Sequence, residues 1–488
     1  MALHGLACCT ALLPGPAPHD APSRPPARLD YRVECVLDGV PDRLEVELRV
    51  SGLDPANRDL AFELPLWGEW LTLDEYYVTR VRGSPPVEHD LLNRFYWRPQ
   101  LPEKWDGRLA FHYELPIVAF GCAAQQRFGL LPWRTATYVH GYSVNTLMRL
   151  LVGDARQDGD RHLELVAPKG WSVVTGWGGL AEARQSVALA PTADNTLVVF
   201  GEPVATKTSD GEGGHVEVVQ FGRHEDRTGI VMELAQRVRA AYAKNMDAPP
   251  PGSEHIVVTE PGLGGTRIEG AITIGHPSIE ENGRPDVGTD HFIAHELFHS
   301  WLPGVLAPGP GLDDRGLEWF YEGFTDYFSL WSLAAIGRIT PQQFADHVRF
   351  LETFARASPA LGKVSFADPS VNWRDGDAEP IAYKGGLMLA LHFDVELRDH
   401  GEPGLPMLFR DLMRENGGRY GLAAIKKWCE ANGLEEAWKE YAAAPKLPSV
   451  EDDLVRLGYR ETREGDSRII RAAGAELDSF FRFDPPAK

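Results

Sequence analysis

Cysteine is scarce in this chain of 488 residues: the five cysteines are an odd number and lack metal-type spacing, so they give no disulfide framework. No run of 18 apolar residues occurs, so the sequence gives no membrane-spanning segment. Basic residues are in deficit, because 49 Lys and Arg stand against 70 Asp and Glu and leave a formal net charge of −21. This balance argues against nucleic acid or an anionic membrane surface as a partner.

The length and a hydrophobic content of 43% predict two or three globular domains. Residues 1–28 hold a short apolar run followed by a proline-rich stretch, and we interpret them as a disordered leader or the remnant of a signal peptide. The run lacks a basic residue before it. A cytoplasmic location is therefore favoured, with a periplasmic or secreted protein as the alternative.

Short runs of alternating apolar and polar residues occupy 29–205, at 44–50, 60–64, 109–115 and 196–200. This spacing predicts an N-terminal β-sandwich-like domain. A Gly/Ser/Asp/Glu segment at 206–214 marks the predicted boundary with a second domain, 206–400. In that domain we expect a strand at 216–221, an amphipathic helix at 226–244 and a helix from Pro341 capped by Thr340.

The most informative feature is an HExxH array inside an apolar, helix-forming stretch, formed by His295, Glu296 and His299. Residues four apart lie on one face of a helix within about 6 Å, so the two imidazoles can share one tetrahedral zinc ion. Glu296 then lies beside the metal, where a carboxylate can take a proton from water. His291 is about 12 Å of helix rise from His299, so we expect it to be a first-turn or rim residue.

A catalytic zinc needs a third protein ligand and an open position for water. A second helix is predicted at 316–328, after a loop rich in glycine and proline. Glu318 and Glu322 are one turn apart on this helix and face the same side. Spacing alone leaves both of them open as the third ligand.

The segments HELFHSW and WFYEGFTDYF resemble the gluzincin metallopeptidases, especially the glycyl aminopeptidase family, which is related to aminopeptidase N. The resemblance implies a thermolysin-like catalytic domain with one zinc ion and selects Glu322 as its third ligand. It also implies that Asp326 holds a zinc histidine by its second nitrogen. The segment IAYKGG implies Tyr383 as the oxyanion donor, although Lys384 follows it directly where the family has Y-x-K-G.

Relatives carry a glycine-rich strand whose open edge receives the peptide substrate, and Gly264 and Gly265 occupy that place. In the family a glutamate after these glycines binds the substrate's free amino terminus. Here Arg267 falls at the aligned position and Glu269 lies two residues later, on the same face of a strand. An arginine would repel an ammonium and attract a carboxylate, which changes the substrate question.

Residues 446–459 also resemble this family, whose members commonly continue into a PDZ domain. Too few residues follow Tyr459 for that fold, so 401–488 is predicted to be a helical region without a PDZ domain. The chain is thus expected to be an α+β multidomain protein with zinc and a peptide substrate, in an oligomeric state that the sequence does not give.

The predicted activity is that of a zinc metallopeptidase, most simply an aminopeptidase acting on free amino termini. An endopeptidase of the same fold and a non-catalytic zinc-binding or peptide-binding protein are the alternatives. Glu296 argues against the non-catalytic alternative, because a structural zinc usually has four protein ligands and needs no base.

Overall fold

The computed structural model describes residues 27–37, 42–64, 78–89, 96–121, 131–153, 155–157, 159–190, 195–260, 265–268, 270–279, 286–309, 314–373, 375–415, 417–464, 467–473, 477 and 480–481. Apart from residues 27 and 28, the predicted leader lies outside them. In this described part of the chain, no helix is long and apolar enough to cross a bilayer.

The N-terminal part is built from three sheets. The outer sheet has the order β16 (Arg184–Leu189), β13 (Asp160–Val166), β1 (Arg28–Val36), β2 (Arg43–Ser51), β7 (Leu109–Pro116), β4 (Thr79–Ser84). The inner sheet has the order β15 (Gly179–Glu182), β14 (Ser172–Thr175), β17 (Leu197–Gly201), β10 (Tyr138–Tyr142), β9 (Trp133–Arg134), β8 (Val118–Ala119), with a 3-10 turn, η1 (Ser143–Asn145), after β10. The side sheet has the order β12 (Ala155–Arg156), β11 (Arg149–Val152), β3 (Leu60–Glu63), β6 (Tyr96–Pro99), β5 (Val87–His89). The strands predicted at 44–50, 60–64, 109–115 and 196–200 are confirmed as β2, β3, β7 and β17.

Burial explains the two kinds of strand in this region. Buried and partly exposed residues alternate along β2, because only one face of the outer sheet packs against the core. Every residue of β10 and β17 is buried. One face of the inner sheet packs on the outer sheet, and its other face packs on strands of the second region, 205–275. The inner sheet therefore joins the two regions.

The mixed sheet of the second region has the order β18 (Ala205–Gly211), β19 (Gly214–Gln220), β20 (Glu254–Thr259), β22 (Ala271–Gly275), β21 (Gly265–Ile268). Strands β19, β20 and β22 are parallel, and β21 is an antiparallel edge strand. The predicted boundary segment, 206–214, forms most of β18, the turn after it and the first residue of β19. Its glycines serve a tight turn, and Gly214 has a φ of 79°.

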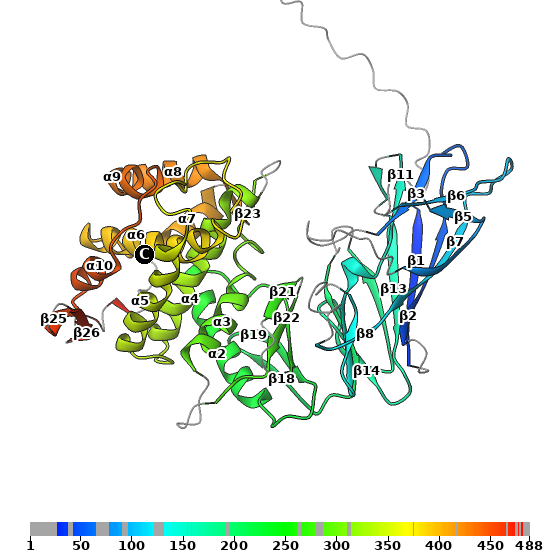
Figure 1. Ribbon diagram of the computed structural model, residues 1–488, viewed down its shortest axis with the longest axis horizontal. Helices are drawn as coiled ribbons and strands as arrows, with labels where there is room; N and C mark the ends of the chain where they lie inside the picture. The colour runs from blue at the N-terminus through cyan, green and yellow to red at the C-terminus, as the bar shows by residue number, and fades with distance from the viewer. Residues whose placement is uncertain are drawn as a thin grey trace, which may run out of the picture.

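Helices cover the side of the mixed sheet that faces away from the β domain (Figure 1). Those that pack on the sheet are α2 (Thr228–Met246) and α3 (Val287–Phe298). Beyond them lie α4 (Phe324–Ala335), α5 (Pro341–Ala357) and α6 (Gly386–Asp399), with the short turns η2 (Asp314–Leu317), η3 (Trp319–Gly323) and η4 (Ile381–Gly385). The predicted helix at 226–244 is confirmed as α2, and Thr340 caps α5 in a capping box with Gln343. The single helix predicted at 316–328 is divided instead into η2, the π-helical η3 and α4.

The C-terminal region contains α7 (Pro406–Glu415), α8 (Leu422–Ala431), α9 (Glu435–Ala437), η5 (Trp438–Ala442) and α10 (Val450–Arg456). It also contains the hairpin of β25 (Arg460–Glu464) and β26 (Ser467–Arg471). Its strand β24 (Arg419–Tyr420) pairs with β23 (Ala307–Pro308), which comes from the preceding region. The prediction of a helical region is therefore incomplete.

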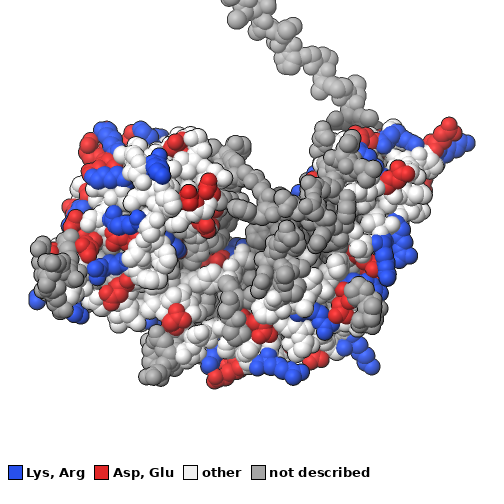
Figure 2. Space-filling model, in the orientation of Figure 1, with Lys and Arg blue, Asp and Glu red and all other residues white. Residues whose placement is uncertain are grey.

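On the face in Figure 2, acidic and basic side chains are interspersed.

Candidate metal centre

The HExxH array lies at the C-terminal end of α3. The carboxylate of Asp286 caps the start of this helix by accepting a hydrogen bond from the amide of Thr289 at 2.9 Å. His295 lies in the last turn, and His299 is the C-cap residue with helical dihedral angles of −61° and −12°. Because the helical geometry continues to residue 299, the Nε2 atoms of the two imidazoles lie 3.0 Å apart.

Glu322 completes a three-membered group with these histidines. Its Oε2 lies 3.0 Å from Nε2 of His295 and 3.5 Å from Nε2 of His299. A tetrahedral zinc with bonds of about 2.0–2.1 Å separates its ligand atoms by roughly 3.3 Å, so the group fits such an ion. Burial alone would raise the pKa of Glu322, but the two histidines lower it to about 2. The carboxylate is therefore ionised and suited to a cation.

The structure distinguishes the two glutamates that spacing left open. Among the described side chains, the ligand atoms within 4.8 Å of one another include that of Glu322 but not that of Glu318. Glu318 is buried one turn earlier and accepts a hydrogen bond from Oη of Tyr321 at 3.3 Å. The geometry thus brings Glu322 to the histidines.

Glu322 and Tyr383 both lie in π-helical turns, η3 and η4. Such turns contain an extra residue and often occur at functional sites. The two turns meet at glycines: a Cβ on Gly323 would lie only 2.5 Å from Cα of Gly386. The absence of side chains at this contact lets the two segments approach, so that Glu322 and Tyr383 lie near one another.

Asp326 orients the first histidine. Its Oδ1 lies 2.8 Å from Nδ1 of His295, and Nδ1 of His299 lies 2.8 Å from the carbonyl oxygen of Leu302. Each imidazole then donates its Nδ1 proton to oxygen and presents Nε2 to the group, where a metal would take the lone pair once any proton on that nitrogen is lost. The orientation of both rings is set by neighbours outside the three-membered group.

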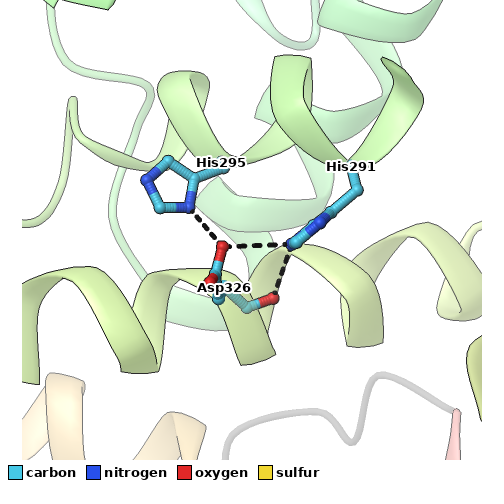
Figure 3. A group of neighbouring side chains, drawn as sticks. All are labelled: His291, His295 and Asp326. Atoms are coloured by element: carbon cyan, nitrogen blue, oxygen red, sulfur yellow. Dashed lines mark hydrogen bonds and ion pairs between the residues drawn. The ribbon is translucent and has the colours of Figure 1, made fainter. Parts of the chain in front are cut away.

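Figure 3 shows a second group, in which Oδ1 of Asp326 lies between His295 and His291. His291 is buried, with Nε2 3.1 Å from the carbonyl oxygen of Asp326 and Nδ1 3.3 Å from His347. The prediction of a first-turn or rim position is wrong, because α3 begins at 287 and turns His291 toward α4. Nζ of Lys384 lies 2.7 Å from the other Asp326 oxygen, so an ammonium already balances this carboxylate.

Two further ionisable side chains, Glu296 and Tyr383, lie beside the candidate metal ligands. Glu296 is buried, and burial raises its pKa, while His295, His299 and Arg267 oppose that shift. The ring of Tyr383 stacks on His295 with centroids 6.3 Å apart. Burial, and then the charge of Glu322, raise the pKa of Tyr383, so its hydroxyl stays protonated. The site therefore combines a buried carboxylate with a neutral hydroxyl donor.

Comparison with known proteins gives structural matches alone: no family model and no curated protein sequence matches the chain. The aminopeptidase N family protein of Idiomarina loihiensis has a TM-score of 0.72 at 15% identity, over 92% of this chain and 82% of that one. The M1 zinc metallopeptidase of Deinococcus radiodurans has a TM-score of 0.53 at 15% identity, over 87% and 95%. Yeast LTA4 hydrolase has a TM-score of 0.51 at 12% identity, over 86% and 68%. The chain has the fold of the M1 zinc metallopeptidases.

In this M1 fold, β21 is the edge strand predicted to receive the peptide. Gly265 is the first residue of β21. A Cβ at this position would collide with the ring of Phe292 on α3, so the glycine permits β21 to lie close to α3. Arg267 is partly buried and donates to Oγ of Ser300 at 3.0 Å. Gly264 and Glu269, the other predicted substrate residues, lie outside the described residues.

The inner sheet contributes a residue that the sequence did not indicate. Burial raises the pKa of Tyr142 on β10, and the charge of Glu296 raises it further, so this hydroxyl lies within electrostatic reach of the proposed base. The position of Tyr142 depends on the packing of the β domain against the mixed sheet. No local motif marks it, since Tyr142 lies some 150 residues before the array.

Proposed function

We propose that this protein is a zinc-dependent peptidase. The observation that carries the proposal is the convergence of His295, His299 and Glu322, with Glu296 buried beside them. The M1 fold supports it, because the proteins of similar structure include zinc metallopeptidases. A zinc ion held by these three side chains would supply Lewis acidity toward a water molecule and a peptide carbonyl.

The protein's own side chains account for the proton transfers. Glu296 accepts a proton from the attacking water and returns it to the leaving nitrogen. Tyr383 donates its hydroxyl proton in a hydrogen bond to the oxygen that becomes negatively charged. Asp326 keeps His295 in the tautomer that leaves Nε2 free.

The substrate class is open between two candidates. An aminopeptidase is the simplest expectation from the resemblance to the glycyl aminopeptidase family. An enzyme that does not require a free amino terminus is the second candidate, and the position of Arg267 on the edge strand favours it. We further propose that the protein is related to the glycyl aminopeptidases and is located in the cytoplasm.

The test is hydrolysis of a peptide panel with free and acetylated amino termini, measured together with zinc content. Wild-type protein is expected to bind about one zinc per chain and to cut peptides, and Glu296→Gln is expected to keep the zinc and lose the cutting. If the protein binds zinc but shows no hydrolysis that is lost in Glu296→Gln, the result would instead support a non-catalytic protein.

A further inference from the structure

A buried cluster of charges lies where the edge strand meets the end of the zinc helix. Glu254, at the start of β20, is fully buried, and its Oε2 lies 2.8 Å from Nη1 of Arg239. The same oxygen accepts a hydrogen bond from Oγ of Ser300 at 2.7 Å and lies 3.4 Å from Nη2 of Arg267. Two guanidinium groups thus share one carboxylate.

Within the cluster itself, one Glu254 carboxylate cannot balance two arginines, so a surplus positive charge remains for groups outside the cluster, of which Glu296 is one. Arg239 is fully buried and gives its other donors to the carbonyl oxygens of Gly213, Pro251 and Gly252. Arg267 differs, because 16% of its side chain is exposed. The surplus charge therefore reaches the surface through Arg267.

The position of Arg267 relates this charge to the metal centre. Ser300, which holds its guanidinium, directly follows His299 in the chain. The charge of Arg267 also opposes the rise in the pKa of Glu296, which places the two side chains within electrostatic reach. Among the described strands, β21 is the last in its sheet, so a peptide added to its outer edge with the reacting carbonyl beside Glu296 would lie along the strand that carries Arg267.

We propose that Arg267 makes the site selective for peptides that place a carboxylate beside β21, and unfavourable for a free ammonium there. The inference rests on the proposed function and narrows its substrate class. A guanidinium fixed by Ser300 and Glu254 presents a cation at a set place, and a fixed charge discriminates between ligands of opposite sign. The carboxylate has two sources: an acidic group on the amino-terminal side of the reacting bond, or the peptide's own carboxyl terminus.

The experiment measures binding of four tetra-alanine peptides to the zinc-loaded Glu296→Gln protein by calorimetry. One peptide has a free amine and a C-terminal amide, one is acetylated and amidated, one is succinylated and amidated, and one is acetylated with a free carboxylate. We expect at least one of the two carboxylate peptides to bind about tenfold more tightly than the neutral peptide, and the ammonium peptide to bind more weakly than the neutral one. The stronger carboxylate peptide identifies the source.

The preference should vanish when Arg267→Gln is added and should survive Arg267→Lys, which keeps the charge. Arg237→Gln is the matched control, because Arg237 is an exposed arginine of α2 and its loss removes the same charge elsewhere. Tightest binding by the ammonium peptide, or a carboxylate preference that Arg267→Gln leaves intact, would overturn the inference. Binding without any charge preference would overturn it while leaving the proposed peptidase function in place, whereas no binding by any peptide would count against both.

Discussion

The ammonium of Lys384 lies 2.7 Å from Oδ2 of Asp326. The other oxygen of the carboxylate holds His295, so the ion pair links the turn that carries Tyr383 to a metal ligand. Lys384 directly follows Tyr383, and the family pattern places a lysine one residue later. The departure from the pattern thus has a structural role, because the lysine reaches Asp326 from this position.

Removing that ion pair should weaken zinc binding. In Lys384→Met, the buried Asp326 loses its balancing charge and orients His295 less firmly, so we expect zinc affinity to fall about tenfold. Lys384→Arg keeps the charge and should lose less. Competition with a chromophoric chelator measures both affinities, and equal zinc affinity in Lys384→Met and wild type would contradict this account.

The choice of the third ligand gives a paired prediction. Glu322→Gln should lose most of its zinc, because an amide is a poorer ligand and no longer brings a negative charge to the two histidines. Glu318→Gln is the matched control one turn away, and it should keep about one zinc per chain, since its carboxylate lies outside the group. Metal analysis after dialysis decides the question, and the reverse pattern would assign the metal to Glu318.

The part of this site that lies within one helix could be predicted from the sequence. The parts that depend on a π turn or on the packing of two regions could not. His295 and His299 could be paired because their spacing belongs to a single helix. Glu318 and Glu322 could not be separated, because they face the same side of any regular helix, and the π turn at 319–323 is not visible in a hydrophobic pattern. Tyr142 could not be predicted, because its place depends on how two regions pack.

The segment 206–214 illustrates the same limit in the fold. Glycine and polar residues are typical both of a linker and of a hairpin turn, so composition does not choose between them. The antiparallel pairing of β18 with β19 makes the segment part of a hairpin. That hairpin joins the sheet through the parallel pairing of β19 with β20, which lies more than 30 residues away in sequence. Short-range patterns predicted the alternating strands and the cap of α5 because each depends on neighbouring residues.

Tyr383 gives a prediction about rate. Tyr383→Phe removes one hydrogen-bond donor to the oxygen that becomes charged, and such a loss costs about 100-fold to 1,000-fold in kcat. Zinc content should be unchanged, since His295, His299 and Glu322 supply the three candidate ligand atoms and all remain in this variant. Steady-state kinetics with a peptide substrate tests the prediction, and an unchanged kcat would remove Tyr383 from the mechanism.

The protonation of His295 predicts that zinc uptake releases a proton. Burial alone would lower its pKa, but Asp326 and Glu322 together raise it to about 10 in the metal-free protein. The raised value means that the ring is protonated below about pH 10 and must lose its proton to bind zinc, whereas Glu322, with a pKa of about 2, is already ionised. Calorimetry at pH 8, in two buffers of different ionisation enthalpy, should show that about one proton is released from His295 for each zinc bound. A binding enthalpy independent of buffer would show that the ring is already neutral.

The contact between Gly323 and Gly386 should determine whether the two halves of the site stay together. A methyl group at 323 would lie 2.5 Å from Cα of Gly386 and 2.7 Å from the carbonyl oxygen of Ala382, so η3 and η4 must separate to admit it. We expect Gly323→Ala to lower the free energy of unfolding by about 1–3 kcal/mol, as overpacking does in a dense core. The separation should also reduce kcat, because it moves Glu322 away from Tyr383.

Gly376→Ala is the control, since a Cβ there meets no heavy atom within 4 Å and should leave stability nearly unchanged. Thermal unfolding and peptide hydrolysis measured on both variants check the prediction. Equal behaviour of the two variants would mean that the glycine contact does not determine the placement of the two π turns.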